Sequence, residues 1–246
     1  MSTWVSGSGQ LVLIPSLLGS DDVSWVAPVT AQYLKKIKHF IVESEKSARR
    51  FLKKVDRDIV IDELTFYVIP KNKGKKNKFV GYDVLNEFLM PASMGGIVGL
   101  LSDAGCPAIA DPGNVFVAEA HKQGVQVVPL PGPSSILLAL IASGLNGQSF
   151  SFYGYLPIDS GERRIAIRKI EDAAINTKSA QIFMETPFRN MQILETILAV
   201  CSPKTKLCIA MDISMPSQKI LTLSLSDWRK LKPNLHKIPA VFVMGV

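Results

Sequence analysis

Short apolar runs of strand length alternate with segments of helical periodicity along the first part of the chain. The runs LVLI, HFIV, IVGLLS and VQVVPL are each followed by a helical pattern, as in HFIV and then SEKSARRFLKKV. Strands that alternate with helices form a sheet with helices packed on its faces. The alternation therefore predicts an α/β fold, and no other feature of the sequence constrains the architecture as much.

A second series of such runs begins after the turn-prone segment GLNGQS at residues 144–149. Its run KILTLSLS alternates apolar and polar residues, which favours an antiparallel or mixed portion of sheet. We therefore expect an N-terminal α/β domain at residues 1–146 and a C-terminal α/β domain with a mixed sheet at residues 147–246. Two such halves leave a cleft between them, and ligand pockets favour domain interfaces and the carboxyl ends of strands.

The composition is that of a globular protein without a membrane span. With 47% hydrophobic and 20% charged residues, a chain of 246 residues can bury a sizeable core. No apolar run approaches the roughly 18 residues that cross a bilayer. No Lys or Arg precedes the early run LVLIPSLL, which argues against a secretory signal.

The cysteines and histidines form no pattern typical of a metal site or a disulfide framework. The cysteines are three in number and none is paired at metal or redox spacing, which favours a reducing cytosol. The histidines stand singly, so we expect no metal site. These residues are Cys106, Cys201, Cys208, His39, His121 and His236.

Positive charge is concentrated in the segment that begins at Lys35 and ends at Lys78. This segment holds 14 Lys and Arg against 6 Asp and Glu, whereas the formal net charge of the whole chain is +7. A polyanionic partner fits such a segment, because contacts from lysine and arginine to phosphates supply affinity that does not depend on sequence. Its densest part, KNKGKKNK at residues 71–78, is typical either of a solvated loop or of an RNA or phosphate contact.

The stretch LLSDAGCPAIADPG contains two glycine turns directly behind a strand-like run. Gly105 can adopt backbone angles that other residues avoid, and it lets a ligand lie against bare main chain. We assign ligand binding to the first turn, SDAGCP, between Ser102 and Pro107. The second turn, DPGN, is typical of a turn that leads into a helix, with Asn114 as the helix cap.

The stretch VVPLPGPSS repeats this design after the next strand-like run. Three prolines around Gly132 stiffen the chain, and Ser134 and Ser135 stand where a helix begins. Their hydroxyl and amide groups suit a polar or anionic ligand, although a turn simply capped by Ser134 explains the pattern equally well. The chain has no GxxxxGK[ST] motif and no GxGxxG after its first strand, which weakens both a P-loop and a dinucleotide-binding interpretation.

Four motifs in this order and spacing resemble a known family: SDAGCPAIADPG, VVPLPGPSS, FYGYLP and FMETPFRN. They are similar to the tetrapyrrole methylase superfamily of S-adenosylmethionine-dependent methyltransferases. Within it, they are most similar to the bacterial enzymes that methylate a ribose 2′-hydroxyl of small-subunit ribosomal RNA. The resemblance runs from about residue 11 to the last residue, 246. It implies two α/β domains, a homodimer, and S-adenosylmethionine folded in the interdomain cleft.

The resemblance also implies a set of cofactor-binding residues at strand ends and loops. They follow the first strand, line the two glycine and proline loops, and end three strands of the second domain. The set comprises Pro15, Leu18, Ser102, Gly105, Cys106, Pro107, Ile109, Ser134, Ser135, Met184, Met211 and Ala240.

The chain departs from the ribose-methylating enzymes of this superfamily in three places. Those enzymes usually have Thr at the position of Cys106 and an acidic-Asp-Thr-Arg signature where this chain reads ESEK, and they usually continue past the VFVMGV strand with a helical extension. Three functions therefore remain open. The first is methylation of ribosomal RNA, the second is methylation of a tetrapyrrole or another small molecule, and the third is binding of cofactor or RNA without turnover.

Methyl transfer to a ribose hydroxyl needs a group that removes the proton or stabilises the oxyanion. The motif METPFRN supplies Glu185 and Arg189 directly after a strand. We predict Glu185 as an orienting residue or base and Arg189 as a phosphate or substrate clamp, with Asp103 as a further candidate. The alternatives are a structural ion pair between Glu185 and Arg189, and an Asp103 that caps its own loop.

Overall fold

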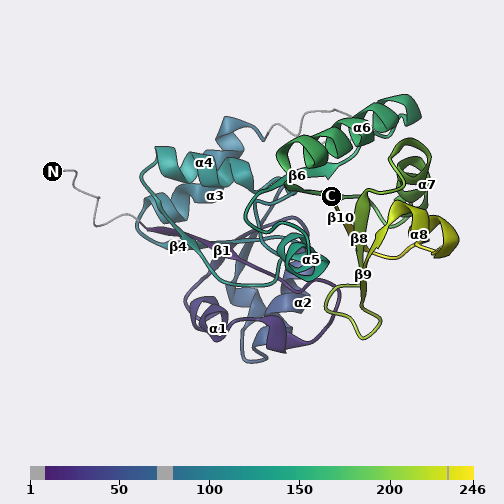
Figure 1. Ribbon diagram of the computed structural model, residues 1–246. Coiled ribbons are helices and arrows are strands. Elements are labelled where there is room, and N and C mark those ends of the chain that lie inside the picture. The colour runs from purple at the N-terminus through teal and green to yellow at the C-terminus, as the bar shows by residue number, and fades with distance from the viewer. Residues whose placement is uncertain (1–8, 71–79, 232) are drawn as a thin grey trace. The chain divides into compact units, whose positions relative to one another are not determined.

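The computed structural model of the protein describes residues 9–70, 80–231 and 233–246 (Figure 1). The chain forms two compact units, Met1–Pro133 and Ser134–Val246. Each unit contains one five-stranded sheet. None of the described helices is long and apolar enough to span a membrane.

The first unit is built on a fully parallel sheet with the strand order β3-β2-β4-β1-β5. Strand β1 therefore lies between β4 and β5, and the carboxyl ends of all three strands meet at one edge of the sheet. The strands are β1 (Gln10–Ile14), β2 (His39–Val42), β3 (Thr65–Val68), β4 (Ile97–Leu101) and β5 (Gln126–Pro129).

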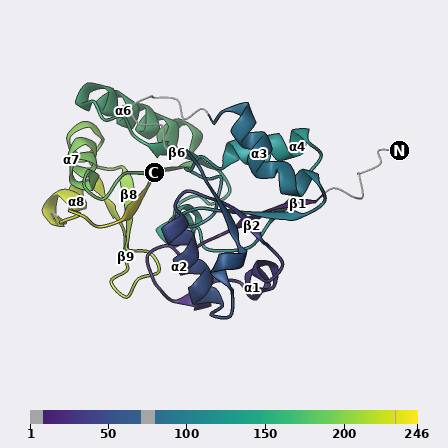
Figure 2. The ribbon, with the colours of Figure 1, turned by 180° about the vertical axis from the view of Figure 1, so that it is seen from behind.

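Helices cover both faces of this sheet. Side chains alternate along a strand, so Val12 and Ile14 pack into a core with α1 and α2, whereas Leu11 packs into a second core with α3 and α4. Figures 1 and 2 show these two helix pairs on opposite sides of the sheet. The helices are α1 (Pro28–Leu34), α2 (Glu45–Val55), α3 (Tyr82–Ser93) and α4 (Asn114–Lys122), with short 3₁₀ turns at Val23–Trp25 and Ile61–Glu63.

The second unit contains a mixed sheet with the strand order β6-β7-β10-β8-β9. Strands β6 and β7 are parallel, and the other three neighbouring pairs are antiparallel. The strands are β6 (Phe150–Tyr155), β7 (Ala180–Met184), β8 (Lys206–Met211), β9 (Lys219–Ser224) and β10 (Ala240–Gly245). The helices are α5 (Ser135–Ser143), α6 (Ser160–Thr177), α7 (Asn190–Val200) and α8 (Leu225–Leu231).

The core of the second unit lies between its sheet and helices α6, α7 and α8. Phe183 and Phe242 stack there with ring centroids 5.4 Å apart, and the buried Trp228 donates its indole N–H to the carbonyl of Leu207 at 2.8 Å. Helix α5 contacts β8, β9 and β10. Figure 1 shows it on the other side of the sheet from α7 and α8.

The observed elements match the α/β expectation, and the predicted runs LVLI, HFIV, IVGLLS and VQVVPL coincide with β1, β2, β4 and β5. The first six residues of KILTLSLS form β9, which pairs antiparallel with β8 in a mixed sheet, as the alternation indicated. The compact units divide after Pro133, whereas the sequence placed a domain boundary after Asn146. The difference is helix α5, which packs on the second sheet although it follows the last strand of the first.

Candidate functional site

Three loops meet at the carboxyl edge of the first sheet, after β1, β4 and β5. The backbone N–H of Ser16 donates to the carbonyl of Gly105 at 2.9 Å, which joins the β1 and β4 loops. Gly132 lies so close to Pro15 that a Cβ atom at Gly132 would stand 2.3 Å from the Pro15 Cβ. The structure thus brings together the predicted residues of these three loops, because their strands are neighbours in the sheet.

The β4 loop is held in shape by its own side chains. Ser102 is 6% exposed, and its hydroxyl donates to the carbonyls of Ala104 and Gly105, both at 3.2 Å. Gly105 has a φ of +73°, and a Cβ there would lie 3.1 Å from a methyl group of Leu18. The Cys106 thiol donates to the carbonyl of Pro133 at 3.5 Å, and burial raises the pKa of this thiol. Gly105 is therefore required both for the backbone angle and for the close approach.

The second turn of this segment stores backbone strain around an exposed isoleucine. Ala108 and Ala110 have φ values of 66° and 59°, a region that alanine rarely adopts, and Ile109 between them is 47% exposed. The Asp111 carboxylate accepts hydrogen bonds from the N–H groups of Ala108 at 2.9 Å and Gly113 at 2.7 Å. Strain of this kind persists where surrounding contacts impose it, and it clusters at functional sites.

The turn leads into helix α4, as predicted, but its cap differs from the prediction. Helix α4 begins at Asn114, and Gly113 occupies the cap position without a side-chain hydrogen bond. Asn114 is therefore the first helical residue and not the cap. The carboxylate of Asp111 instead accepts the hydrogen bond from Gly113, as a short acidic side chain commonly does at a turn.

Asp103 is exposed, and its backbone N–H donates to the Glu43 carboxylate at 3.2 Å. Glu43 is the first residue of the ESEK segment and follows β2, which pairs with β4. The next residue, Ser44, caps helix α2 by accepting from the N–H of Ser47 at 3.3 Å. The ESEK segment thus supports the β4 loop, a contact that sequence reasoning missed because it depends on the order of strands in the sheet.

Three predicted residues of the second unit lie in a row across its sheet. In the strand register, Ala240 is paired with Met211, and Val241 is paired with Met184. The row therefore crosses β7, β10 and β8 at the end where β7 and β8 finish and β10 begins. Both methionines are partly exposed, and Ala240 is buried.

Glu185 and Arg189 form an ion pair beside this row. The Glu185 Oε2 lies 2.9 Å from an Arg189 nitrogen, and the two side chains are 1% and 21% exposed. The other carboxylate oxygen accepts from the N–H of Thr186 at 2.7 Å, and Arg189 donates to the carbonyl of Pro157 at 3.1 Å. Arg189 thus ties the METPFRN segment to the loop that ends the FYGYLP motif, so the structure contains the ion pair weighed above. Catalytic roles for Glu185, Arg189 and Asp103 stay predictions.

Ser134 and Ser135 stand at the start of helix α5 in the second unit. The Ser134 hydroxyl accepts a hydrogen bond from the N–H of Leu137 at 3.5 Å, and Ser134 is 8% exposed. The capping alternative is therefore present in the structure. It leaves the earlier amide groups of this helix end available to a polar ligand.

In each unit, some of the unpartnered polar atoms and most of the strained residues lie in loops next to strand ends. Buried polar groups almost always have a hydrogen-bond partner, so the exceptions call for a reason. Among the described residues, the buried side-chain oxygens that lack one are those of Ser16, Thr30, Glu185, Asn190 and Ser214, although the Glu185 oxygen is ion-paired. Apart from Lys178 at a helix end, the described non-glycine residues with positive φ are Ala108, Ala110, Asp212, Ser214 and Lys237.

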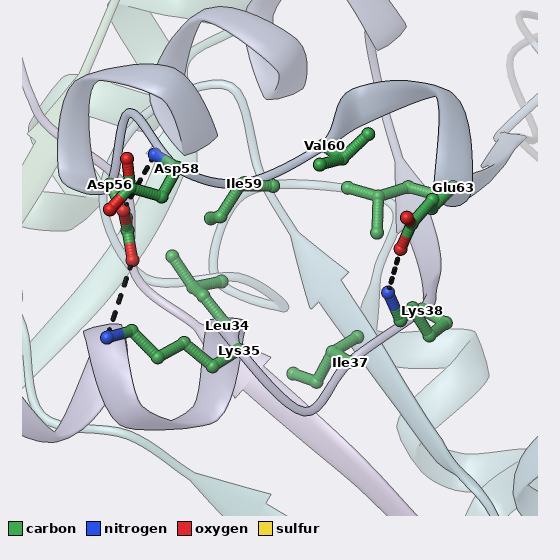
Figure 3. A pocket seen from close by; sticks show the side chains of 10 residues that line it. Leu34, Lys35, Ile37, Lys38, Asp56, Asp58, Ile59, Val60 and Glu63 are labelled. Atoms are coloured by element: carbon green, nitrogen blue, oxygen red, sulfur yellow. Dashed lines mark hydrogen bonds and ion pairs between the residues drawn. The ribbon is translucent and has the colours of Figure 1, made fainter.

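A hollow of about 250 Å³ opens elsewhere in the first unit (Figure 3). Leu34, Ile37 and Ile59 line it, and ion pairs of Lys35 with Asp56 at 3.7 Å and of Lys38 with Glu63 at 2.7 Å flank it. Its lining residues precede β2 and β3, so it lies at the amino edge of the sheet. The predicted site residues of this unit lie at the carboxyl edge, and the hollow is not part of their site.

Residues 18–228 match the family model described as Tetrapyrrole (Corrin/Porphyrin) Methylases. The matched segment includes most of both units and all four motifs that carry the resemblance. The chain belongs to the tetrapyrrole methylase family.

Curated relatives carry the name Ribosomal RNA small subunit methyltransferase I. The relative from Halalkalibacterium halodurans is 33% identical over 193 residues, which are 78% of this chain and 60% of that protein. The relative from Vibrio cholerae is 36% identical over 130 residues, which are 53% of this chain and 44% of that protein. The chain therefore spans less than two thirds of the length of these relatives.

Solved structures of two methyltransferases share the fold. The methyltransferase CobJ has a TM-score of 0.61 at 20% identity, covering 98% of this chain and 94% of CobJ. Uroporphyrin-III C-methyltransferase from Thermus thermophilus, complexed with S-adenosylhomocysteine, has a TM-score of 0.56 at 18% identity, covering 96% of this chain and 97% of that one. At these identities the likeness concerns the fold.

Proposed function

We propose that the protein is an S-adenosylmethionine-dependent methyltransferase that methylates a ribose 2′-hydroxyl of small-subunit ribosomal RNA. The observation that carries the proposal is the interlocked set of loops after β1, β4 and β5, in a chain of the tetrapyrrole methylase family. Relatives at 33% and 36% identity are named for ribosomal RNA, which favours RNA over a tetrapyrrole as the acceptor.

The backbone and side-chain groups of these loops fit a polar cofactor. The hydroxyl of Ser16 is buried and has no hydrogen-bond partner among the described residues, directly beside Gly105. A ligand that supplies a donor or acceptor there would satisfy this oxygen. The cofactor-binding residues are Pro15, Leu18, Ser102, Gly105, Cys106, Pro107 and Ile109 in the first unit, and Ser134, Ser135, Met184, Met211 and Ala240 in the second.

S-adenosylmethionine supplies a methyl group on a positively charged sulfur, which a nucleophile takes in a direct displacement. The protein's task is then to hold the acceptor oxygen in line and to exclude water. Glu185 is held against Arg189 and the Thr186 N–H, so it orients the β7 loop. Arg189 is the more exposed member of this pair. Asp103 lies exposed in the β4 loop. Its carboxylate is the proposed acceptor of the proton.

Helix α2 offers a surface suited to the RNA backbone. Lys46, Arg49, Arg50 and Lys53 are exposed and follow a spacing of three and four residues, which places them on one side of the helix. The opposite side is buried through Phe51 and Leu52. We call the four exposed residues the basic stripe. The KNKGKKNK segment lies outside the described residues, so the stripe carries this part of the proposal alone.

Removing three charges of the basic stripe is expected to weaken RNA binding and its dependence on salt. In the Lys46→Ala, Arg50→Ala, Lys53→Ala variant, the slope of log affinity against log salt for single-stranded RNA should fall by about 2, since each phosphate contact contributes about 0.7. Fluorescence anisotropy at several salt concentrations measures this slope. The matched control replaces Lys122, Lys204 and Lys230, which lie in separate parts of the chain, and its slope should equal that of the wild type. An unchanged slope in the stripe variant refutes the assignment.

Cofactor binding is expected to protect Cys106 from thiol reagents. Burial raises the pKa of its thiol above the ordinary 9.0, so labelling should be slow near neutrality and should accelerate as the pH rises and thiolate forms. Burial and the nearby Glu171 raise the pKa of the buried Cys201 to about 12, and burial also raises that of Cys208. Mass spectrometry after brief alkylation should find Cys106 labelled first. S-adenosylhomocysteine should slow the labelling of Cys106. Equal labelling with and without ligand counts against the site.

The protein is also proposed to act as a homodimer in the reducing cytoplasm. The dimer is what the family resemblance implies, and the compartment is supported by the three free cysteines, of which Cys201 and Cys208 are buried. Sedimentation velocity over a range of concentrations tests the dimer. The interdomain cleft expected for the cofactor stays a prediction as well.

A further inference from the structure

An exposed aromatic ring stands at the turn that follows β7. The N–H of Arg189 donates to the carbonyl of Thr186 at 2.9 Å, which closes a four-residue turn with Pro187 in its second position and Phe188 in its third. Phe188 is 67% exposed, whereas Glu185 in the same loop is 4% exposed. The proline and the hydrogen bond fix the backbone that carries the ring, so the ring is presented to solvent from a rigid turn.

A lysine is positioned over this ring by a strained backbone. The Lys237 ammonium lies 6.0 Å from the centre of the Phe188 ring. The backbone N–H of Lys237 donates to the carbonyl of Pro187 at 3.1 Å, and its φ is 61°. A lysine in this region is strained and persists only because the surrounding structure holds it there.

The two segments are also joined beneath the surface. The side-chain amide of Asn190, which is fully buried, donates to the carbonyl of Ile238 at 2.7 Å. Together with the bond between Lys237 and Pro187, it fastens the β7 loop to the segment that precedes β10. The neighbouring carboxylate of Glu185 is paired with Arg189 and buried, so the exposed charge next to the ring is the positive charge of Lys237.

An exposed ring with a cation over one face, which leaves the other face for a base, matches the chemistry of a nucleotide. Bases of single-stranded RNA stack on exposed aromatic side chains, and lysine pairs with the phosphate that follows. Single exposed apolar residues are common on protein surfaces and need no explanation. Phe188 differs because a strained lysine is fixed over it. In the chain, Phe188 also follows Met184 closely, and Lys237 closely precedes Ala240.

We propose that Phe188 and Lys237 form a platform that stacks one nucleobase of the RNA substrate and binds its phosphate. The proposal rests on the proposed function, since it takes RNA as the partner of the methyltransferase. Phe188 and Lys237 are positioning residues: they hold the nucleotide chain beside the row of Met184 and Ala240, and they take no part in the transfer of the methyl group.

The test compares binding of a short fluorescent oligouridylate by the full-length protein and its variants. Phe188→Ala is expected to weaken binding by about five- to a hundredfold, the range for loss of one stacked base, and Phe188→Trp should restore it. Lys237→Ala should weaken binding and lower the salt slope by about 0.7, whereas Lys237→Arg should keep both. The control is Phe150→Ala, because Phe150 is 43% exposed but pairs with Ala180 at the opposite end of β6 and β7.

Calorimetric titration with S-adenosylhomocysteine separates failure of the platform from failure of the proposed function. All variants should bind this ligand as the wild type does. Wild-type binding of RNA that is unaffected by Phe188→Ala, or lost equally in Phe150→Ala, overturns the platform and leaves the proposed function standing. A wild type that binds S-adenosylhomocysteine and uroporphyrin but not the oligonucleotide overturns the RNA proposal and the platform together.

Discussion

Replacing Gly132 by alanine is expected to weaken binding of S-adenosylhomocysteine by about a hundredfold. The new Cβ would lie 2.3 Å from the Pro15 Cβ and 2.6 Å from its Cγ, far inside van der Waals contact. Neither side can yield easily, because Pro15 is a ring and Gly132 stands between Pro131 and Pro133. The β5 loop must therefore move away from the β1 loop, and a shift of about 1 Å at a binding site costs on the order of a hundredfold.

The same substitution should destabilise the fold only moderately, by about 1–3 kcal/mol, as overpacking usually does. Titration calorimetry measures binding, and thermal unfolding confirms that the variant is folded at the temperature used. Gly81→Ala is the matched control, because a Cβ at Gly81 meets no atom within 4 Å. If the Gly132→Ala protein bound the ligand as tightly as the control, the loops after β1 and β5 would not form the cofactor site.

Arg189→Ala should destabilise the protein by about 3–5 kcal/mol, the usual effect of removing one partner of a buried ion pair. The Glu185 side chain is 1% exposed, so its charge would remain in the interior without the cation that now lies 2.9 Å away. The carbonyl of Pro157 would lose its donor as well. Urea denaturation measures the loss, and replacing both partners by uncharged residues should recover a large part of it.

An exposed ion pair serves as the comparison for Arg189. Lys230 and Asp227 are 2.9 Å apart in helix α8, with side chains 78% and 48% exposed. Water and salt screen such a pair, so Lys230→Ala should change stability far less than Arg189→Ala. Similar effects of the two substitutions would mean that the pair of Glu185 and Arg189 does not hold the β7 loop together.

Much of the fold could be predicted because its strands are buried on both faces or alternate clearly. The run HFIV coincides with β2, and the alternation in KILTLSLS marks β9. Two elements were missed, β3 and α3. The short TFYV run of β3 lies at the edge of its sheet and is only partly buried, and Pro91 inside α3 interrupts the helical pattern that would have revealed it.

The candidate site could be predicted in its loops but not in its long-range contacts. Glycine and proline chemistry marked the loops around Gly105 and Gly132, and the ion pair of Glu185 and Arg189 was one of the two alternatives that the METPFRN motif offered. The bond from Asp103 to Glu43 and the placement of Lys237 beside Phe188 follow from strand order and backbone strain. Neither property has a local signal in the sequence, because both arise only when distant segments pack together.

Methyl transfer itself tests the proposed function most directly. Purified small ribosomal subunits from cells that lack this activity would be incubated with the protein and S-adenosylmethionine labelled in its methyl group. The proposed function predicts label in the small-subunit RNA, recovered after alkaline hydrolysis in a dinucleotide, because a 2′-O-methyl group prevents cleavage of the phosphodiester that follows it. A protein that binds S-adenosylhomocysteine but leaves the RNA unlabelled, or that labels a base instead of a ribose, would contradict it.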